Sequence, residues 1–379
     1  MKFYEFVEEV FAAESGGRKP AKLFIGEPDL PTPKIIAEAG VKAVRQGRTK
    51  YVSSQGLVEL RKKIARKHDA KCSQVVVTPG SKFAVFSAVK MLAGNAAGKN
   101  NCNGKREKAT GSADGKGAEV VIPSPHWPGF EAICEREGAK AKLVPASVED
   151  DWEISAEKLG EAIGDKTRLV ILCNPNNPTS TMMSKKAAGE IVKVANERNV
   201  PILIDEAYRG IAFAPMENQA DASNPLCITA GSFSKGFSMT GWRAGYLVAS
   251  EEIASRTVSL AQSTFSCVPE FVQLAASAAL DHPEIEPSTA RIYEARAKAA
   301  CDIFGGKFDF ARPAAGFYIF IGRKRMDGDG VCRELLSRGI AVAPGSAFGA
   351  PEFLRVSLNL PIEKLLPILE RIAKIAAMG

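Results

Sequence analysis

Residues 200–205 read V-P-I-L-I-D, a run that is apolar at almost every position and closes on Asp205. Such a run is typical of a strand that is buried on both faces of a sheet. Similar short apolar runs at residues 118–123, 168–174 and 227–230 alternate with helical stretches. The alternation predicts an α/β protein with a parallel sheet covered by helices. Asp205 then lies at the carboxyl edge, where such sheets bind their ligands.

The composition is that of a soluble globular protein. With 45% hydrophobic and 25% charged residues, the 379-residue chain can form one large core with a smaller companion. The net charge of +7 comes from basic residues spread along the chain, not gathered in one arm or stripe. This spread is weak evidence for a nucleic-acid partner and fits local binding of phosphates and carboxylates equally well. The motifs below favour the second interpretation, and we expect no nucleic-acid partner.

The N-terminal residues and the cysteines indicate a cytoplasmic protein. Residues 1–13 lack the basic start and the uninterrupted apolar run of a signal peptide, and no later segment has transmembrane length without charges. The eight cysteines are scattered without a Cys-x-x-Cys pair, and only three histidines could help them bind a metal. We expect reduced thiols, no bound metal and no membrane attachment.

Changes of pattern along the chain indicate its domains. A long helical pattern begins around residues 34–46, and after a break near Pro269 a helical stretch at 287–304 precedes strand-like segments near 317–321 and 354–358. The predicted parts are an N-terminal segment that packs with the small domain (1–33), a large domain (34–268) and a small α+β domain (269–379).

Residues 94–117 stand apart because they contain many glycines and asparagines and almost no large apolar residue. This composition predicts a flexible surface insertion within the large domain. A functional lid is the alternative interpretation.

The segment 232–246 reads S-F-S-K-G-F-S-M-T-G-W-R-A-G-Y and places Lys235 between small residues, with Arg243 eight positions later. Small neighbours leave room for a ligand against the lysine. A lysine that attacks a carbonyl must be partly unprotonated, so its site has to lower its pKa by desolvation or nearby positive charge. Arg243 could supply that charge while its fork of donors holds a phosphate.

Six further motifs follow one another in the order of the chain. They are G-E-P-D at 26–29, T-P-G-S-K at 78–82, S-P-H-W-P at 124–128, N-P-N-N-P-T-S at 174–180, D-E-A-Y at 205–208 and R-V-S-L at 355–358. With the segment around Lys235, they make nearly the whole chain resemble the class I and II aminotransferases, pyridoxal phosphate (PLP) enzymes of fold type I. Aspartate aminotransferase is the nearest type.

The resemblance implies a large domain with a mostly parallel seven-stranded sheet, a smaller α+β domain and a homodimer with shared active sites. It implies that Lys235 holds PLP as a Schiff base and that an amino group moves from an L-amino acid to a 2-oxo acid by ping-pong kinetics. Aspartate with 2-oxoglutarate is the first expectation for the substrates, followed by aromatic amino acids and alanine.

The resemblance also assigns the residues around the cofactor ring. Asp205 would protonate the ring nitrogen, and Tyr208 and Asn177 would hydrogen-bond the phenolic oxygen. Trp127 would stack on the ring. Taken alone, Asp205 could be a helix N-cap, Asn177 a turn residue and Trp127 part of a core.

The phosphate of PLP would lie at a helix N-terminus. The motif at 78–82 is a glycine turn that feeds a helical pattern, where free backbone N–H groups accept a phosphate. The residues assigned to the phosphate by resemblance are Gly80, Ser81, Lys82, Ser232 and Arg243, together with Tyr51 from the partner subunit. A capped helix start and an exposed loop tyrosine are the plain alternatives.

The substrate carboxylate would be bound by Arg355, with Gly26 and Asn177 beside it, again by resemblance. Arginine suits this role because its fork binds a carboxylate through two parallel hydrogen bonds. One departure from the family pattern is Ser180, which stands where glycine is usual.

Two other functions remain open from the sequence. A PLP-dependent lyase or decarboxylase of the same fold would use the same cofactor residues, because these do not decide which bond at Cα breaks. A non-catalytic PLP-binding regulator is the more remote alternative, since Lys235 is intact.

Overall fold

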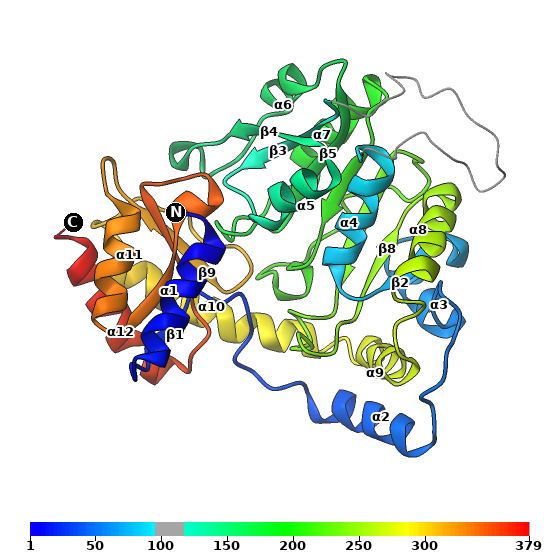
Figure 1. Cartoon of the computed structure of the whole chain (residues 1–379), viewed down its shortest axis with the longest axis horizontal. Coiled ribbons are helices and arrows are strands. Elements are labelled where there is room, and N and C mark those ends of the chain that lie inside the picture. Colours follow the sequence, from blue (N-terminus) through cyan, green and yellow to red (C-terminus); the bar gives the residue numbers. More distant parts are fainter. Residues whose placement is uncertain (95–116, 379) are drawn as a thin grey trace.

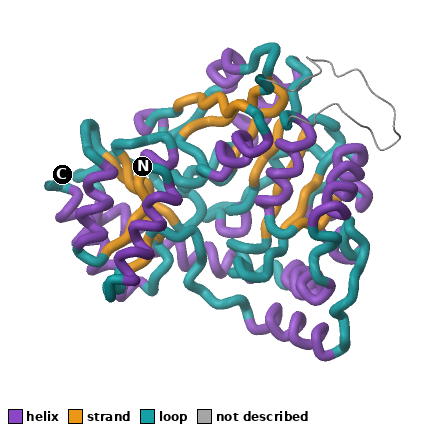
Figure 2. The backbone as a smooth tube through the Cα atoms, viewed as in Figure 1, coloured by secondary structure: helices purple, strands orange, loops and turns teal. Residues whose placement is uncertain are grey.

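The computed structural model describes residues 1–94 and 117–378. Apart from its two end residues, the insertion predicted at 94–117 lies outside the described residues. Strands lie between layers of helices in both halves of the molecule, as Figure 2 shows. None of the helices in the described ranges has the length and apolar character needed to cross a bilayer.

The larger sheet has seven strands in the order β2-β8-β7-β6-β5-β3-β4. Only β8 runs antiparallel to its neighbours, so the predicted α/β class with a mostly parallel sheet is confirmed. The strands are β2 (Val75–Thr78), β3 (Glu119–Ser124), β4 (Lys140–Pro145), β5 (Thr167–Cys173), β6 (Ile202–Asp205), β7 (Cys227–Ser232) and β8 (Gly245–Val248).

Helices cover both faces of this sheet because its strands carry apolar side chains on both sides. Along β6, Leu203 faces one layer, whereas Ile202 and Ile204 face the other. The first layer contains α4 (Ser81–Leu92), α5 (Gly129–Glu137) and α8 (Glu251–Thr264). The second contains α2 (Lys34–Arg45), α3 (Val58–Lys67), α6 (Ala156–Ala162), α7 (Lys185–Glu197) and α9 (Glu270–Leu280).

A second sheet of four strands, in the order β1-β10-β11-β9, forms the other half of the molecule. The N-terminal helix packs in the same core, and Figure 1 shows it beside this sheet. The strands of this second sheet are β1 (Ala21–Leu23), β9 (Tyr318–Gly322), β10 (Ile340–Pro344) and β11 (Phe353–Ser357). The helices of this smaller half are α1 (Phe3–Ser15), which is the N-terminal helix, α10 (Ile285–Phe304), α11 (Gly328–Ser337) and α12 (Ile362–Ala376).

The two halves are joined by α9 and α10. Helix α9 packs against α2 and α3 of the larger half, whereas α10 packs against α12 and β9 of the smaller half. The predicted domain boundaries at 33/34 and 268/269 stay predictions. Four short 3-10 helices complete the described elements: η1 (Cys72–Gln74), η2 (Val148–Asp150), η3 (Arg209–Ile211) and η4 (Gly345–Phe348).

Candidate active site

A cavity of about 360 Å³ lies at the carboxyl ends of the central strands and is closed by residues of the smaller half. Strand β6 delivers Asp205 to it, and β11 delivers Arg355 from the other half. All the site residues expected from the sequence, apart from Tyr51, line this cavity: Gly26, Gly80, Ser81, Lys82, Trp127, Asn177, Asp205, Tyr208, Ser232, Lys235, Arg243 and Arg355.

Lys235 lies in the loop that follows β7, and its Nζ donates a hydrogen bond to the Gly26 carbonyl oxygen. Burial, together with the nearby Arg355 guanidinium, lowers the pKa of this amine to about 8. On the order of one tenth of Lys235 is therefore unprotonated at pH 7. The amine meets the condition for attack on a carbonyl carbon.

Asp205 is buried at the end of β6, where its Oδ1 accepts a hydrogen bond of 3.0 Å from the Ala207 backbone N–H. Burial raises the pKa of this carboxyl to about 7, against the lowering effects of that hydrogen bond and of Lys235. A carboxyl that is this costly to ionise would gain from a cationic partner inside the cavity.

The start of α4 forms one wall of the cavity. Gly80 is the N-cap residue with φ 82°, a left-handed conformation that favours glycine. A Cβ at this position would lie 2.6 Å from Nη2 of Arg243, so a larger residue would also displace the arginine. The first backbone N–H groups of α4, from Ser81 and Lys82, have no partner within the helix. Together with Arg243 they form a site suited to a phosphate.

Hydrogen bonds connect Arg355, Asn177 and Tyr208 across the two halves of the molecule. Arg355 Nη1 donates to Asn177 Oδ1 at 2.9 Å, and its Nη2 donates to the Phe24 carbonyl at 2.6 Å. Asn177 Nδ2 in turn donates to Tyr208 Oη at 3.2 Å. Among the described residues, Nε of the buried Arg355 has no hydrogen-bond partner. An anion entering the cavity could accept from it.

Trp127 follows β3 and lies in the cavity wall, with its ring edge-to-face against Phe130 at a centroid distance of 5.2 Å. Lys82 Nζ lies 5.2 Å from the centroid of the Trp127 ring. A Cβ on Gly129 would collide with the indole, so glycine is required beneath it. The Trp127 ring is thus held in place beside a cation.

Tyr51 is 87% exposed and does not line the cavity of its own chain. Its expected role toward a neighbouring subunit stays a prediction.

Several residues that line the cavity were not predicted from the sequence. The structure adds Phe3, Glu27, Cys173, Ala207, Ser234, Thr240 and Tyr318 to the lining. Glu27 directly follows Gly26 in a motif already singled out, and its Oε1 accepts a hydrogen bond from Thr240. Tyr318 begins a strand that the sequence predicts, but the pattern does not show which face of that strand meets the cavity.

Ser180, the departure from the family pattern, is fully buried with φ 58°. Its carbonyl oxygen accepts hydrogen bonds from the N–H groups of Ala314 and Ala315 in the smaller half. Its hydroxyl has no partner among the described residues. The turn therefore keeps the left-handed conformation for which glycine is the ordinary residue, although a serine occupies it.

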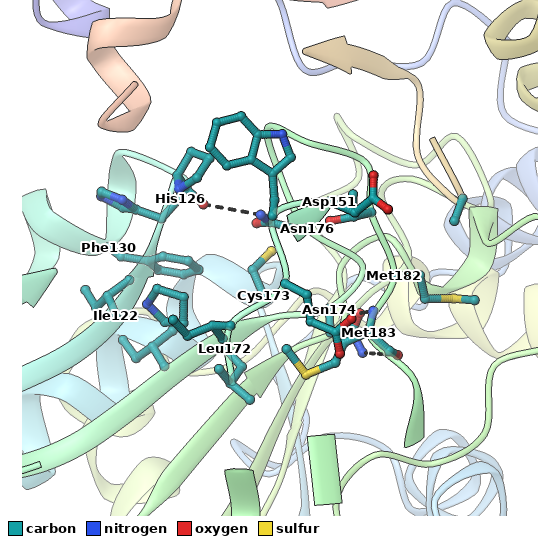
Figure 3. A pocket seen from close by; sticks show the side chains of 18 of the residues that line it. Ile122, His126, Phe130, Asp151, Leu172, Cys173, Asn174, Asn176, Met182 and Met183 are labelled. Atoms are coloured by element: carbon teal, nitrogen blue, oxygen red, sulfur yellow. Dashed lines mark hydrogen bonds between the residues drawn. The ribbon is translucent and has the colours of Figure 1, made fainter. Parts of the chain in front are cut away.

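A second cavity of about 290 Å³ adjoins the first, because Cys173 lines both. Its wall includes Ile122, Phe130, Leu172 and Met183, which Figure 3 shows around Cys173. The expected site residues do not line it.

Comparison with known proteins agrees with this geometry. Residues 18–372 match the family described as aminotransferase class I and II. The chain is 32% identical to an aspartate aminotransferase of Thermococcus kodakarensis, over 93% of this chain and 88% of the relative. It is also 32% identical to a probable aspartate/prephenate aminotransferase of Aquifex aeolicus, over 92% of this chain and 89% of the relative.

A solved structure shows the same fold. The crystal structure of aspartate aminotransferase from Thermotoga maritima superposes with a TM-score of 0.87 at 29% identity, covering 99% of this chain and 96% of that one. The predicted fold type I architecture and aminotransferase activity are confirmed by these matches. The chain therefore belongs to the aminotransferase class I and II family, whose members are PLP-dependent enzymes.

Proposed function

We propose that this aminotransferase binds PLP through Lys235 and moves the amino group of L-aspartate to 2-oxoglutarate. The observation that carries the proposal is the joint position of Lys235, Asp205 and Arg355 in one buried cavity. The lowered pKa of Lys235 supplies an amine that can react with an aldehyde.

The residues of the cavity fit PLP. Asp205 is a buried carboxyl with a raised pKa, and the ring nitrogen of PLP is the cationic partner that would stabilise its charge. The start of α4 and Arg243 suit a phosphate, and the Trp127 ring suits a flat ligand. When bound, PLP supplies an electron sink for the negative charge that develops at the substrate Cα.

The chain's own groups then have separate tasks. Lys235 Nζ would hold the cofactor, and once unbound its amine would move the proton away from the substrate Cα. Asp205 would keep the ring nitrogen protonated. Arg355 binds and orients the α-carboxylate, and its contact with Asn177 links that carboxylate to the cofactor side of the cavity.

Charge in the cavity supports a dicarboxylic substrate. Four cationic side chains line it: Lys82, Lys235, Arg243 and Arg355. Lys235 is assigned to the cofactor, Arg243 to its phosphate and Arg355 to the α-carboxylate. The side chain of Lys82, whose backbone N–H alone is assigned to the phosphate, remains for a second carboxylate. The names of the relatives from Thermococcus kodakarensis and Aquifex aeolicus agree with aspartate as a donor.

A homodimer with shared active sites is part of the proposal. Helix α2 buries Ile36 and Ala43 but leaves Ile35, Val41 and Val44 nearly half exposed. Figure 1 shows α2 at the rim of the molecule, next to α9. A second copy would cover this apolar face, and Tyr51, which follows α2, could then reach the cofactor phosphate of the neighbour. The cytoplasmic location expected from the sequence likewise stays a prediction.

Absorbance spectroscopy tests the proposed function. Purified protein supplied with PLP should show a visible band that disappears with L-aspartate and returns with 2-oxoglutarate. L-alanine and L-phenylalanine serve as competing donors. The variant Lys235→Ala should lose both the covalent attachment and the response to aspartate. Absence of a band in the wild type would refute PLP binding, and an equal or faster response to the other donors would refute aspartate as the preferred substrate.

A further inference from the structure

Tyr318 is the first residue of β9 and is fully buried in the wall of the cavity. Its Oη lies 2.8 Å from Tyr208 Oη. Its ring lies against the Arg355 guanidinium, with 4.3 Å between the guanidinium carbon and the ring centroid. A Cβ on Gly26 would collide with the Tyr318 hydroxyl, so glycine leaves the space for it. Tyr318 therefore contacts groups on both the carboxylate side and the cofactor side of the proposed site.

The orientation of the Asn177 amide follows from its two partners. Arg355 has only donors, so the atom of Asn177 that faces Nη1 at 2.9 Å must be the oxygen. The amide nitrogen then faces Tyr208 Oη at 3.2 Å and donates to it. Tyr208 thus accepts one hydrogen bond from Asn177, which leaves its own proton and its second lone pair for other partners.

The direction of the Tyr208–Tyr318 hydrogen bond can be derived in the same way. Burial raises the pKa of both hydroxyls, so each keeps its proton at neutral pH. Among the described residues, Tyr208 Oη is the hydrogen-bond partner found for Tyr318 Oη. If Tyr208 donated, the proton of Tyr318 would have no such acceptor, whereas a ligand in the cavity can accept from Tyr208.

We propose that Tyr318 is a positioning residue that donates to Tyr208 and thereby turns the Tyr208 proton toward the phenolic oxygen of the bound cofactor. This proposal rests on the proposed function, because it requires PLP in the cavity. Tyr208 then accepts from both Asn177 and Tyr318, and these two hydrogen bonds make its hydroxyl a stronger donor.

The test is a pH titration of the absorbance of the PLP-bound protein without substrate. A weaker hydrogen bond to the phenolic oxygen leaves more negative charge there, which holds the neighbouring proton of the cofactor more tightly. Tyr208→Phe should therefore raise the titration midpoint the most. Tyr318→Phe, which keeps the ring against Arg355, should raise it by a smaller amount of roughly 0.5 pH unit.

The double variant Tyr208→Phe/Tyr318→Phe separates positioning from direct action. If Tyr318 acts only through Tyr208, the double variant should titrate like Tyr208→Phe alone. A shift equal to the sum of the two single shifts would overturn the proposal, and so would an unchanged midpoint in Tyr318→Phe. Tyr246→Phe is the matched control, because it removes another buried hydroxyl, bonded to His68, that does not line the cavity.

A second measurement does not depend on the Tyr318→Phe variant folding. Replacing Tyr318 alone with 3-fluorotyrosine makes its hydroxyl a better donor while keeping the ring and the hydrogen bond. The midpoint should then fall, whereas an unchanged or raised midpoint would overturn the proposal. If wild-type protein mixed with PLP shows no titrating band at all, the proposed function itself has failed, and this proposal fails with it.

Discussion

Burial moves the pKa values of Lys235 and Asp205 in opposite directions, because desolvation disfavours the charged form of each. The amine becomes partly neutral near pH 8 and the carboxyl stays partly protonated near pH 7. Both groups are therefore poorly solvated in the protein without PLP. Binding of an aldehyde to one and a pyridine nitrogen to the other would relieve this cost.

Asp205→Asn should stabilise the cofactor-free protein at high pH. The folded-state pKa of Asp205, about 7, lies above its ordinary value of 3.8, so its contribution to stability is complete below pH 3.8 and is lost as the pH rises through 7. Asparagine stays neutral, and the variant should exceed the wild type by at most about 4 kcal/mol near pH 8, with the gain vanishing toward pH 4. Urea unfolding at pH 8 and at pH 4 measures the difference in the free energy of unfolding between the variant and the wild type.

Addition of PLP should remove or reverse the higher stability of Asp205→Asn near pH 8, because the ring nitrogen then pairs with the Asp205 carboxylate of the wild type. Asp302→Asn, a change at an exposed position of α10, is the control and should show neither effect. A variant Asp205→Asn that is less stable than the wild type near pH 8 without PLP would contradict the burial argument.

Ser180→Gly should stabilise the protein by about 1 kcal/mol, because it relieves a left-handed serine and removes a buried hydroxyl without a partner among the described residues. The shift of the urea midpoint measures this change. Asn199→Gly is the control, since Asn199 also has positive φ but is exposed and asparagine tolerates that conformation. A loss of stability in Ser180→Gly would show that the serine hydroxyl has a stabilising partner.

At the scale of elements, the N-terminus of helix α4 faces the cavity. The sequence predicts a helical pattern after the motif at 78–82, whereas α4 already begins within that motif, at Ser81. The extra residues matter because the free N–H groups that suit a phosphate belong to this first turn. Gly80 makes the turn possible by adopting φ 82° next to Arg243.

Gly80→Ala should weaken PLP binding by at least about tenfold, because the methyl group strains the N-cap and displaces the Arg243 guanidinium. Fluorescence titration with PLP measures the affinity. Gly189→Ala is the matched control: this exposed glycine of α7 has open space for a Cβ, and alanine should stabilise the helix by about 1 kcal/mol without changing PLP affinity. Equal PLP affinities of Gly80→Ala and wild type would exclude α4 from the phosphate site.

At the scale of the whole molecule, the cavity is complete only where the two halves meet. Gly26, Tyr318 and Arg355 come from the smaller half, and Asp205 and Lys235 come from the larger half. A third contribution, from Tyr51 of a partner, would make activity depend on the dimer.

Val44→Glu should weaken self-association by at least about tenfold, because it places a charge on the apolar face of α2, where Val44 is 48% exposed. Sedimentation equilibrium measures the oligomeric state, and activity should fall with the dimer fraction. Ile292→Glu is the control, since Ile292 is similarly exposed (41%) but lies on α10, away from α2. A wild-type protein that sediments as an active monomer would refute the shared site.

Local pattern by itself determined several of the elements and singled out residues at their ends, whereas the family resemblance assigned the chemistry of those residues. The run ending at Asp205 has the continuous apolar character and β-branched content of a buried strand, and residues 202–205 form β6. Lys235, Arg243 and the turn before α4 were also identified from neighbouring residues, because their small neighbours and helix-start signals are local.

Only the tertiary structure decided which side chains share the cavity beyond those that the family resemblance had assigned. Tyr318 and Arg355 alternate with other residues on short strands, and the face that each presents depends on the packing of β9 and β11. The contact between Tyr208 and Tyr318 joins residues 110 positions apart. The pKa values of Lys235 and Asp205 depend on burial, which is a property of the assembled core and not of any sequence window.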